Sequence, residues 1–467
     1  MSATKNLTHL ISNCVGRTFM MIALAFVLPL LGLSTAQEAR SIVKSHSVRA
    51  ANRFPDAGEA PVPGWSGPVF HLSQDYPRSR PLPEKMPWKK YRFDDPNEWK
   101  QYLDAVLTYC LDGNREVDWD VQRNPVRKWY HAPWMHWGTN GREFIHGLTH
   151  ERVSLPGELA PTQKSTFQNW AVGFYNQPGG WILGKVWADP NNPNPEAFHD
   201  FPDGTVSIKL LFSLADPSEV PYIAGSKEWD AYIYTKTETP TNPNGARTVQ
   251  KMRLLQVDIA VRDTRNDANT GWVFATYTVN GALAGADPYK KLIPVGIMWG
   301  NDPQLSSKGA LAQTLINESA DLPAQHLGWN GRLNGPVDNP LSSCLSCHST
   351  SQWKALAGLT PPRTSVQGSA EWMEWFRNIR AGTSFSQNAK SLDYSLQLGV
   401  GMQNFYAWKA IVESRGGVNN STPSRINTLG LVGGVALKKQ EARQSVYTFT
   451  RAPEQEPEPS PPQEQHK

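Results

Sequence analysis

The segment between about Asn169 and Gly300 constrains the fold more than any other part of this 467-residue chain. Apolar and polar residues alternate over 206–212 with the two-residue period of a half-buried strand. Short runs rich in branched and aromatic residues follow at 231–234, 254–261, 272–279 and 293–299. Since no helical pattern of 10 to 15 residues recurs between these runs, we expect mainly antiparallel pairing. The polar, turn-rich stretch 262–271 predicts a hairpin between two of these strands.

A second feature is the pattern C-x-x-C-H, formed by Cys344, Cys347 and His348. Two thiols at this spacing can each form a thioether with one of the two vinyl groups of haem, and the adjacent imidazole can bind the iron. We therefore expect one covalent haem c on Cys344 and Cys347, with His348 as the proximal axial ligand.

Other uses of the two cysteines fit the sequence less well. A zinc site needs two more ligands, and the remaining cysteines, Cys14 and Cys110, stand alone. A thioredoxin-like pair needs a βαβ context, whereas Pro336 and Pro340 place the motif after a loop.

The N-terminus has the pattern of an export signal. Lys5 and Arg17 precede an uncharged apolar run over 18–33, which ends in small residues at 34–36. Residues 1–36 are therefore predicted to be a cleaved signal peptide, with an uncleaved membrane anchor as the alternative. Since haem is attached covalently outside the bacterial cytoplasmic membrane, we expect a periplasmic protein.

The remaining segments predict an α+β protein, in which a β-rich N-terminal domain is followed by a small helical cytochrome c-like haem domain. Residues 37–90 are rich in proline and predict an extended arm. The β-rich domain covers 91–300 and begins with a helix after Asp95, with Cys110 packed on its buried stripe. The haem domain covers 301–440, with short helices at 310–318, 370–380 and 403–415, and the Pro- and Glu-rich stretch 441–467 predicts disorder.

The haem segment resembles the small class I c-type cytochromes. In that family a loop methionine before a C-terminal helix is the second iron ligand, and Met402, which follows Gly399 and Gly401, matches it. Met373 is the competing candidate, although its helical, aromatic surroundings favour core packing. The resemblance also implies that a carbonyl at Pro361 or Pro362 accepts a hydrogen bond from the proximal imidazole.

The β-rich segment is similar to the cytochrome P460 family in the order FPDGTV at 201–206, Lys209, GWVF at 271–274 and then C-x-x-C-H. That family holds a five-coordinate c-type haem on a β-sheet fold and cross-links a strand lysine to the porphyrin. The resemblance implies this role for Lys209, whereas the strand pattern alone favours an ordinary solvent-facing lysine.

Other polar residues predict weaker sites. His146 and His150 would share one face of a helix, which is metal-ligand spacing, but a hydrogen-bonded structural cluster is the preferred interpretation. His326 is interpreted as a loop residue. Three lysines could surround an exposed haem edge and attract an acidic redox partner, or could be ordinary solvated residues: Lys354, Lys390 and Lys409.

These features predict a monohaem c-type cytochrome that exchanges single electrons with periplasmic redox proteins. A P460-like oxidoreductase acting on a small molecule at an open iron site and a haem-based redox sensor are the alternatives. The formal net charge of +4 gives no reason to expect nucleic-acid binding.

Overall fold

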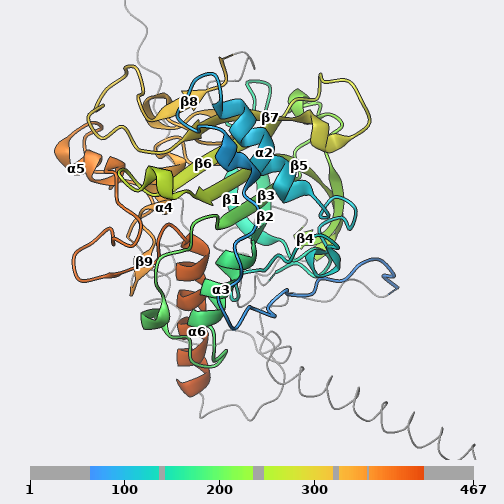
Figure 1. Cartoon of the computed structure of the whole chain (residues 1–467). Coiled ribbons are helices and arrows are strands. Elements are labelled where there is room, and N and C mark those ends of the chain that lie inside the picture. Colours follow the sequence, from blue (N-terminus) through green and yellow to red (C-terminus); the bar gives the residue numbers. More distant parts are fainter. Residues whose placement is uncertain (1–63, 136–141, 235–246, 319–325, 355–356, 415–467) are drawn as a thin grey trace, which may run out of the picture. The chain divides into compact units, whose positions relative to one another are not determined.

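An antiparallel sheet dominates the computed structural model, which describes residues 64–135, 142–234, 247–318, 326–354 and 357–414 (Figure 1). Seven strands follow the order β1-β2-β3-β5-β6-β7-β8, and β4 pairs with part of β5. The strands are β1 Thr149–Ser154, β2 Phe167–Tyr175, β3 Val206–Ser213, β4 Glu228–Tyr234, β5 Arg247–Arg262, β6 Trp272–Val279, β7 Leu292–Met298 and β8 Thr314–Ile316. The predicted antiparallel β-rich architecture is confirmed.

Helices and short elements complete the described fold. The α-helices are α2 Trp99–Leu111, α3 Gln177–Val186, α4 Cys344–His348, α5 Ala370–Met373 and α6 Leu396–Ser414. Short 3-10 turns are η1 Pro87–Lys90, η2 Val121–Arg123, η4 Pro195–Ala197, η5 Pro221–Ile223, η6 Thr264–Asn266, η7 Pro288–Lys291, η10 Trp329–Gly331 and η11 Glu374–Phe376. A two-stranded ribbon pairs β9 Gln352–Trp353 with β10 Lys390–Ser391. No helix in the described ranges is long and apolar enough to span a membrane.

One face of the sheet is apolar and packs against α2, which lies across it in Figure 1. Ile208, Val257 and Tyr277 contribute to this core from neighbouring strands. The predicted N-cap Asp95 is wrong, because α2 begins at Trp99 with Glu98 as its N-cap. Asp95 lies in the preceding turn, where its carbonyl oxygen accepts a hydrogen bond from Trp99 N at 3.0 Å. Cys110 is fully buried on this helix and burial raises the pKa of its thiol, which confirms the predicted packed cysteine.

The opposite face of the sheet carries the C-terminal part of the described chain. A second apolar cluster joins Trp272 and Phe274 of β6 to Leu345 of α4, Tyr394 and Leu398. The sheet therefore lies between α2 on one side and the segment that contains the C-x-x-C-H motif on the other.

Three predicted helices differ from the structure. The helix expected at 310–318 is wrong, because Thr314–Ile316 forms strand β8 and pairs with β7. The helix expected at 370–380 is limited to α5 and η11. The last helix begins at Leu396 rather than at 403, so Met402 lies within α6 and not in a loop. The predicted signal peptide, residues 1–36, and the predicted disordered tail, 441–467, lie outside the described residues.

Candidate functional site

The C-x-x-C-H motif forms the five-residue helix α4, whose N-terminus is capped by side chains. Ser343 Oγ accepts a hydrogen bond from Ser346 N at 3.0 Å, and Ser346 Oγ accepts one from Ser343 N at 2.8 Å. Ser343 Oγ also donates to Asn301 Oδ1 at 2.9 Å, which ties the helix to the residues after β7. Since so short a helix is not stable alone, these caps and the fully buried Leu345 fix its position.

Cys344 and Cys347 are half-buried and form no disulfide. Cys344 Sγ lies 3.6 Å from Thr276 Oγ1 of β6. Burial and the nearby Asp338 carboxylate raise the pKa of Cys347 to about 12, and burial raises that of Cys344 as well. Both side chains are therefore neutral thiols at physiological pH.

His348 has one ring nitrogen anchored and one open for ligation. Its Nδ1 lies 2.8 Å from the carbonyl oxygen of Tyr394, so Nδ1–H is the donor and Nε2 carries the lone pair. Burial lowers the pKa of His348 to about 4, which keeps the imidazole in the neutral, metal-binding form. The predicted acceptor at Pro361 or Pro362 is wrong, because Tyr394 provides the carbonyl.

A small cavity lies beside His348. Its volume is about 30 Å³, which is room for about two water molecules and not for a porphyrin. Its lining residues are Tyr175, Ser207, Ala260, Trp272, His348, Tyr394, Ser395, Leu396 and Gln397. The donor set of two unbridged thiols and a neutral imidazole fits haem c, whereas the macrocycle requires space outside this cavity.

A polar row crosses the sheet on the face that carries α4. Lys209 of β3 is paired with Asp258 of β5, and Asp258 with Thr276 of β6. Thr276 Oγ1 donates to Asp258 Oδ1 at 2.9 Å, and the same hydroxyl oxygen lies beside Cys344. The row therefore extends to the first thiol of the motif.

Two carboxylates share one amide within this row. Gln256 Nε2 lies 2.8 Å from Asp258 Oδ1 and 2.7 Å from Asp338 Oδ2. Burial and the neighbouring Asp338 raise the pKa of Asp258 to about 7. Lys209 Nζ forms an ion pair with Glu151 Oε1 at 2.9 Å, and although burial alone would lower the pKa of Lys209, Glu151 raises it. Lys209 is thus a half-buried ammonium group in a charged row and not the solvent-facing residue expected from the strand pattern.

The two candidate methionines lie in different clusters. Met402 is fully buried in α6 and belongs to the same apolar cluster as Leu345 of α4. Met373 packs against the cluster of Trp329, Trp372, Phe376, as expected for a core-filling residue.

The predicted histidine pair does not lie on a helix. His150 belongs to β1 and packs edge-on against Trp170, whereas His146 lies in the preceding turn and stacks on Trp229 with ring centroids 4.1 Å apart. Beside them, the Glu143 carboxylate accepts backbone hydrogen bonds, one of which comes from Ile145 N at 2.8 Å. These contacts support the interpretation of the two histidines as part of a structural cluster and not as metal ligands.

The remaining predicted residues, one histidine and three lysines, do not form a common site. His326 is buried and its Nε2 lies 3.3 Å from Leu159 O. Lys354 is exposed after β9 and Lys390 is half-buried in β10, the strand paired with β9. Lys409 Nζ lies 6.0 Å from the ring centroid of Phe405 in α6. Among the described residues, no three His, Cys, Asp or Glu side chains group as metal ligands.

Sequence reasoning missed the groups that support the motif. Tyr394 acts through its backbone carbonyl, which every residue possesses, so no side-chain pattern marks it. Asn301 and Ser343 are ordinary polar residues. The only sequence signal is the spacing between Ser343, just before the motif, and Ser346 within it, which is typical of a helix N-terminus.

No family model, curated protein or solved structure matches this chain.

Proposed function

We propose that this protein is an exported monohaem c-type cytochrome that transfers single electrons. Cys344 and Cys347 would hold the haem covalently and His348 would ligate its iron. The observation that carries the proposal is the arrangement of α4, where two unbridged thiols adjoin an imidazole whose Nδ1 is anchored at 2.8 Å and whose Nε2 is left for a metal. Bound haem supplies a one-electron iron couple.

The protein's own residues prepare this site in three ways. The Ser343 cap and the buried Leu345 set the direction of α4. The Tyr394 carbonyl fixes the tautomer of His348 and raises its basicity as a ligand. The burial that lowers the pKa of His348 prevents its protonation from competing with ligation at neutral pH.

A P460-like enzyme with an open iron position is the second candidate. One observation favours it: the strand residue Lys209 lies on the sheet face that carries the motif, in register with Asp258. The ion pair with Glu151 opposes it, because a protonated amine is a poor nucleophile for a cross-link.

Met402 is the proposed sixth ligand of the electron carrier. Its burial in the cluster that contains Leu345 supports this assignment, although its helical position departs from the loop methionine of class I cytochromes. Thioether ligation closes the iron and favours electron transfer at a raised potential.

Visible spectra of the purified protein, oxidised and reduced and with and without carbon monoxide, separate the two functions. We expect a low-spin spectrum with a far-red sulfur-to-iron band that is lost in Met402→Ala. Met373→Ala is the matched control and should keep the band. A high-spin spectrum that binds carbon monoxide readily and is unchanged by Met402→Ala would contradict the carrier and favour the open site.

A further inference from the structure

The hydrogen-bond acceptor of His348 lies in a strained turn. Asp393 and Tyr394 have φ values of 48° and 65°, so two consecutive residues with side chains adopt the left-handed conformation. Each such residue costs about 1 to 2 kcal/mol and persists only where the surroundings enforce it. The turn presents Tyr394 O to His348 Nδ1 at 2.8 Å.

The carboxylate of Asp393 is the main anchor of this turn. It is 1% exposed and accepts hydrogen bonds from Trp272 Nε1 at 2.9 Å, Phe201 N at 3.0 Å and Gly382 N at 3.3 Å. Trp272 of β6 and Phe201 are distant from Asp393 in sequence, whereas Gly382 lies 11 residues before it. Three donors on one buried carboxylate hold the residue in place against the strain of its backbone.

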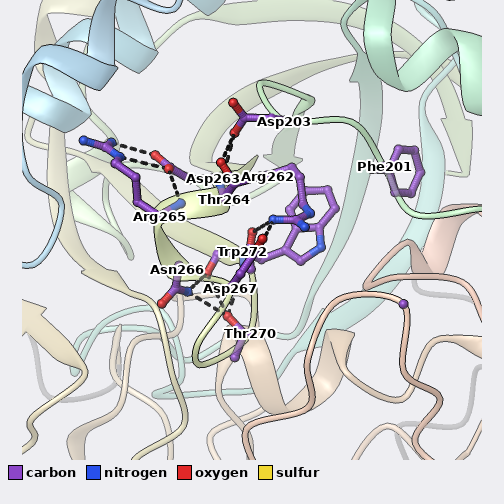
Figure 2. A network of polar contacts seen from close by, with 12 residues as sticks. Phe201, Asp203, Arg262, Asp263, Thr264, Arg265, Asn266, Asp267, Thr270 and Trp272 are labelled. Carbon is purple, nitrogen blue, oxygen red and sulfur yellow. Dashed lines mark hydrogen bonds and ion pairs between the residues drawn. The ribbon is translucent and has the colours of Figure 1, made fainter.

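The anchor residue Trp272 is itself held by the hairpin between β5 and β6, shown in Figure 2. Asn266 Nδ2 donates to Trp272 O at 2.8 Å and to Thr270 Oγ1 at 2.9 Å. Asp203 Oδ1 accepts from Thr264 N at 3.1 Å on the outer side of the same hairpin. The position of Asp393 is therefore set by the hairpin at the ends of strands β5 and β6.

The other side of the turn is tied to the residues that follow α4. Leu392 N donates to Ser351 O at 3.2 Å, and the hydroxyl of Tyr394 donates to Ile379 O at 2.5 Å. A shift of the turn would consequently move the carbonyl that orients His348.

We infer that Asp393 is a positioning residue for the iron ligand: its buried carboxylate holds the Asp393–Tyr394 turn so that the Tyr394 carbonyl sets the orientation and basicity of His348. The inference rests on the proposed haem function. Loss of the anchor weakens the Nδ1 hydrogen bond, makes the imidazole a poorer donor and destabilises the ferric relative to the ferrous state.

The test compares Asp393→Asn with the wild type, both matured with haem. Asparagine keeps an oxygen for Trp272 Nε1 but turns an amide toward Phe201 N, so the anchor is weakened with little change in volume. We expect the one-electron reduction equilibrium to shift toward the ferrous state by about tenfold, which is 59 mV. We also expect a lower iron–histidine stretching frequency in the resonance Raman spectrum of the ferrous protein, measured after photolysis of its carbon monoxide adduct.

Two further variants keep the test decisive. Asp216→Asn is the control, since the exposed Asp216 lies 3.7 Å from Arg253 Nη1 and does not pair with Arg262, and it should leave both readouts unchanged. Trp272→Phe removes only the Nε1 donor to Asp393, and this variant is tested instead if Asp393→Asn does not fold. A folded, haem-loaded variant with the wild-type potential and stretching frequency would overturn the inference. Absence of covalent haem from the wild type would instead refute the proposed function, and the inference with it.

Discussion

The N-cap of α4 offers a sharp test of how the motif is held. Ser343→Ala removes the hydroxyl that accepts from Ser346 N at 3.0 Å and donates to Asn301 Oδ1 at 2.9 Å. Loss of a helix cap costs about 0.5 to 2 kcal/mol. The unpaired, buried Asn301 oxygen adds about 1 to 3 kcal/mol. We therefore expect the free energy of unfolding to fall by about 1.5 to 5 kcal/mol.

Urea unfolding of the purified protein, followed by tryptophan fluorescence, measures this loss. Ser343→Thr is the matched control, because it keeps the hydroxyl and should lose less than about 1 kcal/mol. Haem loading of Ser343→Ala should fall as well, since α4 carries both thiols. A loss below about 0.5 kcal/mol with an unchanged denaturant slope would refute the view that the cap holds the helix.

Three more predictions concern the surroundings of the motif. Leu345→Ala, at a fully buried position, should cost about 2 to 5 kcal/mol in urea unfolding, and a cost below about 1 kcal/mol would contradict its packing role. Burial and Asp338 raise the pKa of Asp258 to about 7, so the folded state holds a proton that the unfolded chain releases at lower pH. Stability should then fall as the pH rises from about 4 to about 7, and a wild-type slope retained in Asp258→Asn would exclude this group as its source. Gly173→Ala should displace Gln397, because Gln397 Nε2 would lie 2.2 Å from the new Cβ. Gln397→Ala in the same chain should restore the wild-type stability, and failure to restore it would show that the glycine has another role.

Local patterns account for what the sequence predicted well. The alternation over 206–212 and the apolar run 272–279 appear as β3 and β6, because strand periodicity is a property of neighbouring residues. Strand β8 was missed, because its three residues are recognisable as a strand only through their pairing with β7.

The glycines before Met402 were interpreted as a loop for a similar reason. A Cβ at Gly401 would lie 2.4 Å from the carbonyl oxygen of Pro133, so this glycine permits close packing of α6 against another segment. Helix α6 can therefore contain it, which no local propensity indicates.

Only part of the candidate site could be predicted from the sequence, for the same reason. Cys344, Cys347 and His348 are recognised from their spacing alone. The acceptor at Tyr394 and its anchor Asp393 depend on a turn enforced by donors from distant segments, so only the folded chain brings them together.

Mass spectrometry of the mature protein tests the central claim most directly. The protein should be produced with its N-terminal segment in a host that matures c-type cytochromes, and digested with trypsin. We predict that the peptide 333–354, which contains Cys344 and Cys347, carries the mass of one haem, and that Cys344→Ser with Cys347→Ser abolishes this while Cys110→Ser does not. An unmodified 333–354 peptide from a protein made in cells that load a control cytochrome would contradict the account.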